Sequence, residues 1–286
     1  MLFAAPSETA LAIEPTHADC EYARVEDLPL TLDLYLPAEQ ANRPLLLWIH
    51  GGAWRSGSKR PMPLEALVAA GFPVARVDYR LSPVARFPAQ IHDLKAAVRF
   101  LRARRAKYNL STERLIVCGN SAGGHLAALL GTTNGHVELE GSVGEFPDAD
   151  SSVQGIVSFY GMSNFTTILA QSTPHGLSVR KPALDLLLGG QPEAVPELAR
   201  LASPVFHVDA GDPPLLLLHG DQDVQAPINQ SHELQGRYEE LGLSCRFVVV
   251  HGAGHGGPEF YDERRLAIVR EFLSSLEESP TTETSP

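Results

Sequence analysis

The chain has 286 residues, 44% of them hydrophobic, and carries 23 basic against 34 acidic side chains for a net charge of −11. This length and composition suffice for one large α/β domain with a substantial core. The negative charge excludes nucleic acid as an expected partner, because a polyphosphate would be repelled. No apolar run reaches transmembrane length, so no membrane partner is expected. The three cysteines show neither metal-ligand spacing nor a disulfide framework.

The two ends of the chain carry no folding pattern. Residues 1–15 lack a basic segment followed by a sustained apolar stretch, so no signal peptide is expected. The expected localisation of the chain as given is cytoplasmic, with secretion left open if a leader has been removed. Residues 279–286 are polar and predict a disordered tail.

Strand-like and helix-like segments alternate along most of the chain. Residues 28–36 alternate apolar and polar side chains, which predicts an early antiparallel strand, whereas 44–50 is continuously apolar, as in a strand covered on both faces. Further strands are predicted at 72–79, 115–118, 153–160, 214–219 and 245–250, and helices at 64–70, 88–107, 124–130, 228–241 and 262–276. This alternation predicts an α/β fold with a mostly parallel central sheet and helices on both faces.

One segment interrupts the alternation. Residues 161–212 are rich in Pro and Ser with short helical pieces. We interpret the chain as a single domain over 16–278, with 161–212 as a small cap inserted over the site. The alternative is that this insertion is a disordered loop.

The pentapeptide G-N-S-A-G at 119–123 lies between a predicted strand and a predicted helix. This is the G-x-S-x-G pattern in its strand–turn–helix context, in which a sharp turn exposes a serine hydroxyl above the sheet. The pattern predicts Ser121 as a nucleophile. The alternative is an ordinary glycine-rich turn with an exposed serine.

A second glycine-rich loop, H-G-G-A-W at 50–54, directly follows the strand predicted at 44–50. Paired glycines let backbone N–H groups come close to a carbonyl oxygen on which negative charge develops. The predicted oxyanion donors are Gly52 and Ala53, with Gly51 as an alternative, together with Ala122, the residue after the nucleophile.

Four further side chains lie in or beside these two loops. Trp54 is either packing or a wall of the acyl pocket, and we predict that Trp54 and Asn120 bind substrate. His50 is expected to brace its loop by hydrogen bonding, and His125 is expected to be structural.

A serine nucleophile needs a base, and the base needs a carboxylate that fixes its tautomer. The loop at 219–227 offers Asp221 and Asp223, and the loop at 251–256 offers His251 and His255. Each loop follows a predicted strand, where open α/β sheets place their sites. These residues leave two candidates open for each role.

Together these motifs resemble the α/β-hydrolase superfamily over residues 28–276, in the Ser…Asp…His order of that superfamily. The elbow with its tail, G-N-S-A-G-G-H-L-A, and the block D-Y-R-L-S-P at 78–83 are similar to carboxylesterases of the hormone-sensitive-lipase group and of the BD-FAE type, which are feruloyl and acetylxylan esterases. Hormone-sensitive lipases carry a third glycine in place of Ala53 and an aspartate in place of Asn120. They also have a longer N-terminal region, so the differences favour the BD-FAE type.

The resemblance implies that Asp223, the second aspartate of its loop, and His255 complete the triad with Ser121. It implies a serine carboxylesterase acting on short-acyl or hydroxycinnamoyl esters, small or carbohydrate-linked, without metal or cofactor. H-G-G-x-W is equally typical of arylformamidases of the kynurenine-formamidase type, which is the alternative activity. A non-catalytic ligand-binding hydrolase fold is the alternative of another class. The oligomeric state is not predicted.

Overall fold

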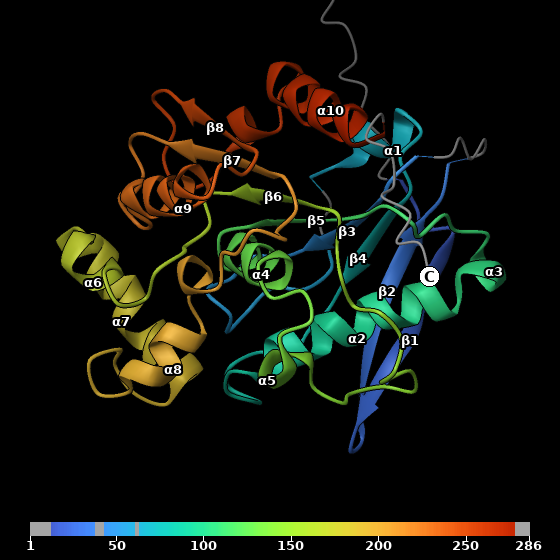
Figure 1. The fold of residues 1–286 in the computed structure, drawn as a ribbon, viewed down its shortest axis with the longest axis horizontal. Coiled ribbons are helices and arrows are strands. Elements are labelled where there is room, and N and C mark those ends of the chain that lie inside the picture. Colours follow the sequence, from blue (N-terminus) through green and yellow to red (C-terminus); the bar gives the residue numbers. More distant parts are fainter. Residues whose placement is uncertain (1–12, 38–42, 61–62, 278–286) are drawn as a thin grey trace, which may run out of the picture.

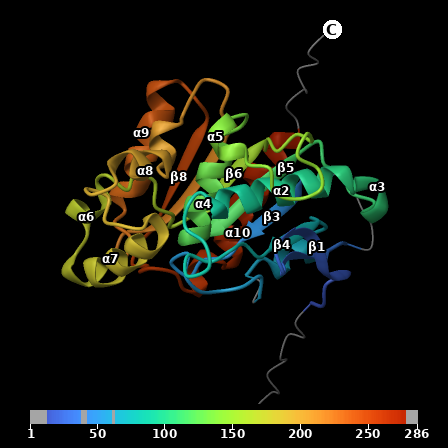
Figure 2. The same ribbon diagram turned by 90° about the horizontal axis from the view of Figure 1, so that it is seen from below.

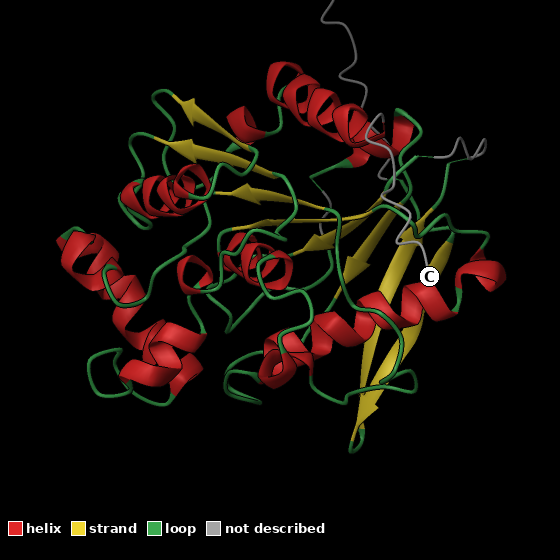
Figure 3. Ribbon diagram, in the orientation of Figure 1, coloured by secondary structure: helices red, strands yellow, loops and turns green. Residues whose placement is uncertain are grey.

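A single sheet organises the computed structural model, which describes residues 13–37, 43–60 and 63–277. Its strands follow the spatial order β1-β2-β4-β3-β5-β6-β7-β8. They span β1 His17–Val25, β2 Leu28–Tyr35, β3 Leu45–Ile49, β4 Val74–Val77, β5 Leu115–Asn120, β6 Gly155–Phe159, β7 Leu215–Gly220 and β8 Cys245–Val250. Figure 3 shows these strands as one twisted layer with helices on both sides.

Strand direction follows the predicted pattern. Strand β2 runs antiparallel to both β1 and β4, and the remaining neighbours from β4 to β8 pair in parallel. The expected α/β fold with a mostly parallel sheet and an early antiparallel strand is therefore confirmed. Parallel strands bring their carboxyl ends to one edge of the sheet, and the glycine-rich loops all start at that edge.

Strand β3 shows why the central strands are apolar throughout. Leu45, Leu47 and Ile49 belong to one buried core, whereas Leu46 and Trp48 belong to the core on the other face. Successive side chains of a strand point to opposite faces, so a strand covered on both sides needs an apolar residue at every position.

The helices divide between these two faces. They span α1 Glu65–Ala69, α2 Ala89–Ala103, α3 Arg105–Tyr108, α4 Ala122–Gly131, α5 Val137–Glu140, α6 Ile168–Gln171, α7 Pro174–Leu188, α8 Pro196–Leu201, α9 Asn229–Glu240 and α10 Glu263–Glu277. Helices α2, α4 and α9 supply residues to one core, and α1 and α10 supply residues to the other. Figure 1 shows α1 and α10 on the opposite side of the sheet from α2 and α4.

The elements differ from the sequence-based expectation most clearly in three places. Strand β1 was not expected, because it is an edge strand whose mostly exposed side chains give no regular apolar pattern. The helix expected at 88–107 divides at Arg104 into α2 and α3. The elbow helix starts at Ala122, two residues earlier than expected.

Residues 161–212 fold into helices and are not a disordered loop. They form α6, α7, α8 and a short 3₁₀ helix, Pro204–Phe206. Helix α7 starts at the cap residue Thr173, whose hydroxyl accepts the N–H of Gly176 at 3.0 Å. Figures 1 and 2 both place α6, α7 and α8 together at one side of the molecule. The predicted tail at 279–286 lies outside the described residues.

Candidate active site

Ser121 lies at the tight turn between β5 and α4. Its backbone adopts φ 52° and ψ −117°, a conformation that L residues rarely adopt. The flanking glycines permit this turn: a Cβ on Gly119 would lie 2.3 Å from the Gly123 oxygen, and one on Gly123 would lie 2.1 Å from the Ile49 oxygen. The turn therefore has no room for a Cβ at position 119 or position 123.

The predicted nucleophile, base and acid lie in one line of hydrogen bonds. Ser121 Oγ is 2.7 Å from His255 Nε2, and His255 Nδ1 is 2.6 Å from Asp223 Oδ2. The Asp223 side chain is fully buried, and the His255 side chain is 11% exposed. With Nδ1 donating its proton to Asp223, Nε2 is left free to accept the Ser121 proton.

Asp223 is held by more than His255. Its Oδ1 accepts the backbone N–H groups of Gln225 and Ala226, both at 2.8 Å. Its Oδ2 also lies 3.3 Å from Nε2 of His219, which is buried at the end of β7. Burial alone would raise the pKa of Asp223, but the hydrogen bonds from His219 and His255 outweigh burial and hold that pKa well below its usual value. The carboxylate therefore stays ionised beside His255.

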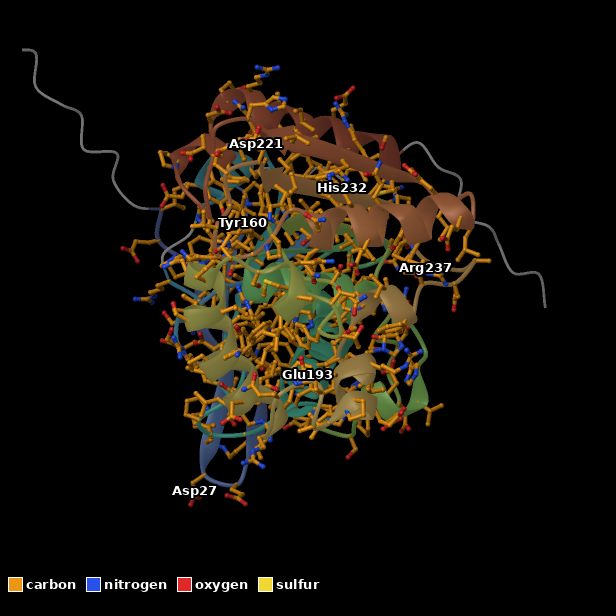
Figure 4. The ribbon with its side chains drawn as sticks, turned by 90° about the vertical axis from the view of Figure 1, so that its left-hand side faces the viewer. Asp27, Tyr160, Glu193, Asp221, His232 and Arg237 are labelled. Carbon is orange, nitrogen blue, oxygen red and sulfur yellow. The ribbon has the colours of Figure 1, made fainter. Side chains whose placement is uncertain are left out.

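Asp221 and His251, the other candidates, pair with each other away from Ser121. His251 Nδ1 is 2.8 Å from Asp221 Oδ2, and the Gly252 N–H donates to Asp221 Oδ1 at 2.8 Å. The His251 side chain is 83% exposed. This pair joins the loops after β7 and β8 at the surface, where Figure 4 labels Asp221.

The loop after β3 lies against the serine turn. A Cβ on Gly51 would lie 2.9 Å from the Asn120 carbonyl oxygen, and Gly52 has a φ of +110°. Among the described residues, the N–H groups of Gly52, Ala53 and Ala122 donate to no protein acceptor. Gly52 and Ala53 line the same cavity as Ser121, and Ala122 starts α4 directly after it. These N–H groups are therefore available to a ligand.

His50 lies beneath this loop, as expected. Its Nδ1 donates to the Gly51 carbonyl at 2.7 Å, and its ring stacks on Tyr79 at 4.5 Å between centroids. Burial lowers the pKa of His50. The ring therefore supports the loop as a neutral imidazole and lies outside the line from Asp223 to Ser121.

The structure corrects the prediction that Trp54 binds substrate. Its side chain is fully buried and lies outside the cavity wall. The indole donates to His125 Nδ1 at 3.1 Å and packs edge-on against Phe165. An indole at this position fills the core beneath the loop, so the packing alternative describes it. His125 is itself buried and bonded to the Ala202 carbonyl, as its expected structural role requires.

Asn120, by contrast, lines the cavity beside Ser121. Its amide donates to the Tyr160 hydroxyl at 3.1 Å, and that hydroxyl lies 3.1 Å from the Tyr261 hydroxyl. The Tyr160 ring packs edge-on against the ring of His255 at 5.0 Å. Tyr160, labelled in Figure 4, therefore supports the side of the imidazole.

These side chains surround a cavity of about 590 Å³ that opens on Ser121 and His255. The insertion supplies Val179 and Arg180 to its wall, both from α7. Sequence reasoning did not single out Arg180, Tyr160 or His219. No local motif marks Arg180 or Tyr160, which reach the site from other parts of the chain. His219 lies four residues before Asp223 in the 219–227 loop, and its contact with that carboxylate appears only in the structure.

A family model described as BD-FAE matches residues 32–238. The chain belongs to the BD-FAE family. The match runs from the second half of β2 through β7 and includes the serine turn and the loop of Asp223. The predicted resemblance is confirmed.

Two curated relatives of this BD-FAE chain are named as ester hydrolases. It is 32% identical over 217 residues to the Mycobacterium tuberculosis "Esterase LipC", covering 74% of this chain and 53% of that protein. It is 33% identical to the "Probable carboxylic ester hydrolase LipM" of the same organism, covering 81% of this chain and 52% of that protein. The chain thus spans about half the length of the curated relatives it matches.

Solved structures agree with the family. A structure titled as a truncated form of a carbohydrate esterase from gut microbiota superposes with a TM-score of 0.82 at 32% identity, covering 91% of this chain and 95% of that one. A Thermogutta terrifontis esterase, 23% identical over 89% of this chain and 92% of that one, shares the fold with a TM-score of 0.73. Within the described part of the BD-FAE chain, no helix is both long and apolar enough to span a bilayer.

Proposed function

We propose that this chain is a serine carboxylesterase in which Ser121, His255 and Asp223 act as a triad. One observation carries the proposal: an unbroken line of hydrogen bonds runs from Asp223 through His255 to Ser121 and ends at the wall of a cavity. Membership of the BD-FAE family and similarity to named esterases support the same reaction class.

The mechanism follows from this geometry. Ser121 Oγ attacks the ester carbonyl carbon while its proton passes to His255 Nε2. The imidazolium then protonates the leaving alcohol, and the C–O bond breaks to give an acyl-enzyme and a free alcohol. Water attacks the acyl-enzyme with the same imidazole as base, which releases the acid and restores Ser121. Asp223 keeps the imidazole oriented and stabilises its positive charge in both steps.

The N–H groups of Gly52, Ala53 and Ala122 are the proposed oxyanion donors. They are unpaired within the described structure and lie on the two loops that meet at Ser121. Donors fixed by a rigid backbone do not have to reorganise when negative charge develops on the carbonyl oxygen. Removing one such donor typically costs about 10²–10³ in rate.

The proposed substrates are short-acyl or hydroxycinnamoyl esters, either small molecules or groups linked to carbohydrate. The BD-FAE family and the carbohydrate-esterase neighbour support this class.

We further propose that residues 16–278 act as one domain, with 161–212 as a cap that closes one side of the cavity. The position of Val179 and Arg180 in the cavity wall supports that role.

A covalent probe tests the nucleophile. A fluorophosphonate should label Ser121, and Ser121→Ala should lose both labelling and roughly 10⁴–10⁶ of kcat on 4-nitrophenyl acetate. The matched control is Ser178→Ala on the exposed face of α7, which should keep both. An unlabelled wild-type protein would instead support a non-catalytic ligand-binding fold.

A substrate panel tests the bond that is cleaved. The panel compares 4-nitrophenyl acetate, acetylated xylan, methyl ferulate and N-formylkynurenine at equal concentration. The proposal expects the largest kcat/KM on an ester. A strong preference for N-formylkynurenine would replace the esterase assignment with the arylformamidase alternative.

A further inference from the structure

The cavity beside Ser121 has a cationic wall in an acidic protein. Arg55, Arg60 and Arg180 all line it, and none of the described residues in its wall is Asp or Glu. The whole chain carries a net charge of −11. Positive charge is therefore concentrated at the place where a substrate would bind, against the overall charge of the molecule.

Arg60 does not account for this charge, because it is already paired. Its Nε lies 3.6 Å from Oδ2 of Asp33, a fully buried carboxylate that also binds Lys59 at 2.8 Å. Lys59 is bonded in turn to Asp19. The two cations and two carboxylates of this cluster offset each other.

Arg180, unlike Arg60, has no carboxylate partner among the described residues. It is 1% exposed, and among the described residues no carboxylate lies within ion-pair distance of it. Its Nη2 donates to the Gln225 carbonyl at 3.2 Å, and its Cζ lies 5.7 Å from the Trp54 ring. Its Nε and Nη1 have no acceptor in the described part of the chain. A buried cation with only neutral partners is costly, and a nearby anion would offset that cost.

Asp223, the carboxylate of the proposed triad, does not pair with Arg180 through a hydrogen bond. Asp223 interacts with Arg180 through space, but its two oxygens already accept hydrogen bonds from the backbone of its own loop and from imidazole. Burial lowers the pKa of Arg180 to about 10, so the guanidinium remains charged at neutral pH. Its field therefore acts on the cavity from a buried position in the wall, with little screening by water.

Arg55 is the cation that a ligand can touch. Its side chain is exposed and lines the cavity, and no ion pair joins it to another described residue. Its backbone is fixed directly after the predicted oxyanion donors, because the N–H groups of Arg55 and Ser56 both donate to the Gly52 carbonyl at 3.1 Å. A guanidinium with fixed backbone and free donors suits the two oxygens of a carboxylate.

We propose that the cavity selects esters that carry a free carboxylate on their acyl or alcohol part, with Arg55 contacting the carboxylate and Arg180 supplying a supporting field. This inference rests on the esterase function proposed above, since it names the substrate class of the same cavity. The ester reaction is unchanged; the carboxylate is a recognition group and takes no part in bond breaking.

Two matched pairs of esters test the proposal on the full chain. On the alcohol side, 4-acetoxybenzoate is compared with methyl 4-acetoxybenzoate. On the acyl side, mono-4-nitrophenyl glutarate is compared with 4-nitrophenyl butyrate, after subtraction of spontaneous hydrolysis. The measured quantity is the anionic-to-neutral ratio of kcat/KM. Taking this ratio in each variant and dividing by the wild-type ratio cancels differences in intrinsic ester reactivity.

Arg55→Gln should lower the anionic-to-neutral ratio about tenfold for at least one pair, as expected for a lost charge-assisted contact. Arg24→Gln is the matched control. It removes the same charge near the tip of the β1–β2 hairpin, where Arg24 donates to Asp27, labelled in Figure 4, and it should leave the ratio unchanged. Added salt should also lower the wild-type ratio, because ions screen an exposed guanidinium.

A binding measurement separates this inference from the esterase proposal. Calorimetric titration compares 4-acetamidobenzoate with neutral 4-acetamidobenzamide, neither of which requires hydrolysis. If the protein hydrolyses no ester yet binds the benzoate more tightly than the benzamide, and Arg55→Gln removes that difference, the anion site stands and the esterase proposal fails. If neutral esters are hydrolysed but both ratios survive Arg55→Gln, the anion site is wrong and the esterase proposal stands.

Discussion

Two carboxylate–imidazole pairs lie side by side in this molecule and differ in what surrounds them. Asp223–His255 and Asp221–His251 come from the same two loops, and their ring-nitrogen-to-oxygen distances are 2.6 and 2.8 Å. The first pair has side chains 0% and 11% exposed, and the second 31% and 83% exposed. Near-identical local chemistry therefore lies in two very different environments.

Environment decides what each pair can do. The exposed pair is solvated and screened, so its ion pair contributes little to stability. The buried pair is removed from water, and its imidazole also faces Ser121 at 2.7 Å. Only the buried pair can pass a proton to and from a bound substrate. The position of a pair relative to the serine turn thus counts for more than the strength of its hydrogen bond.

The largest expected difference lies in the two histidines. His255→Ala should lower kcat on 4-nitrophenyl acetate by roughly 10⁴–10⁶, because the serine loses its base. His251→Ala should change kcat by less than about twofold, since exposed substitutions away from the site have small effects. Stopped assays with both purified variants measure this contrast. Equal losses would mean that the surface pair takes part in the reaction.

The two aspartates should follow the histidines with a smaller contrast. Asp223→Asn should lower kcat by about 10⁴, because the amide allows the wrong imidazole tautomer. Asp221→Asn should leave kcat nearly unchanged. Steady-state kinetics across pH 6 to 9 would check both. A wild-type rate in Asp223→Asn would assign the acid role elsewhere.

The substitution His219→Gln tests a feature that separates the two pairs. In the buried pair, a second imidazole lies beside the carboxylate, whereas the exposed pair has none among the described residues. His219 Nε2 lies 3.3 Å from Asp223 Oδ2 and 2.9 Å from the Ala226 carbonyl, and Ser231 Oγ lies 2.8 Å from His219 Nδ1. Losing this support should cost about 1.4 kcal/mol, or tenfold in kcat with KM unchanged. The acid limb of the pH–rate profile should also move. A change confined to thermal stability would make His219 a purely structural residue.

The last contrast concerns stability and not rate: it is the pH dependence of unfolding. The folded pKa of Asp223 lies below its unfolded value of about 3.9, so its contribution to stability is present above that pH and is lost as pH falls through the folded pKa. The free energy of unfolding of wild type should exceed that of Asp223→Asn by about 2 kcal/mol at pH 7, with the difference shrinking below about pH 4.

Urea denaturation at a series of pH values measures this difference. Asp221→Asn is the matched control, and it should show a smaller difference that added salt removes, because Asp221 is solvated. A gap between wild type and Asp223→Asn that stays constant down to pH 2 would show that ionisation of Asp223 is not its source.

Much of the fold could be predicted from the sequence for a local reason. The apolar runs of the central strands and the periodic helices between them reflect burial on both faces, which every residue of those segments shares. Strand β1 could not be predicted from the sequence, because an edge strand buries few side chains and so shows no regular apolar pattern. Trp54 was ambiguous because an indole beside a glycine loop suits either a pocket wall or a core, and only its contact with His125 decides.

The sequence by itself determined the elements, the serine turn and the loops that carry the polar side chains, because these depend on local periodicity and on glycine at positions too crowded for a Cβ. Tertiary structure alone decided which aspartate meets which histidine and brought Tyr160, His219 and Arg180 to the site. The contact of His219 with Asp223, four residues later, depends on how the loop after β7 folds. The other contacts join segments far apart in the chain. Their distances depend on strand order and register, which no short stretch of sequence encodes.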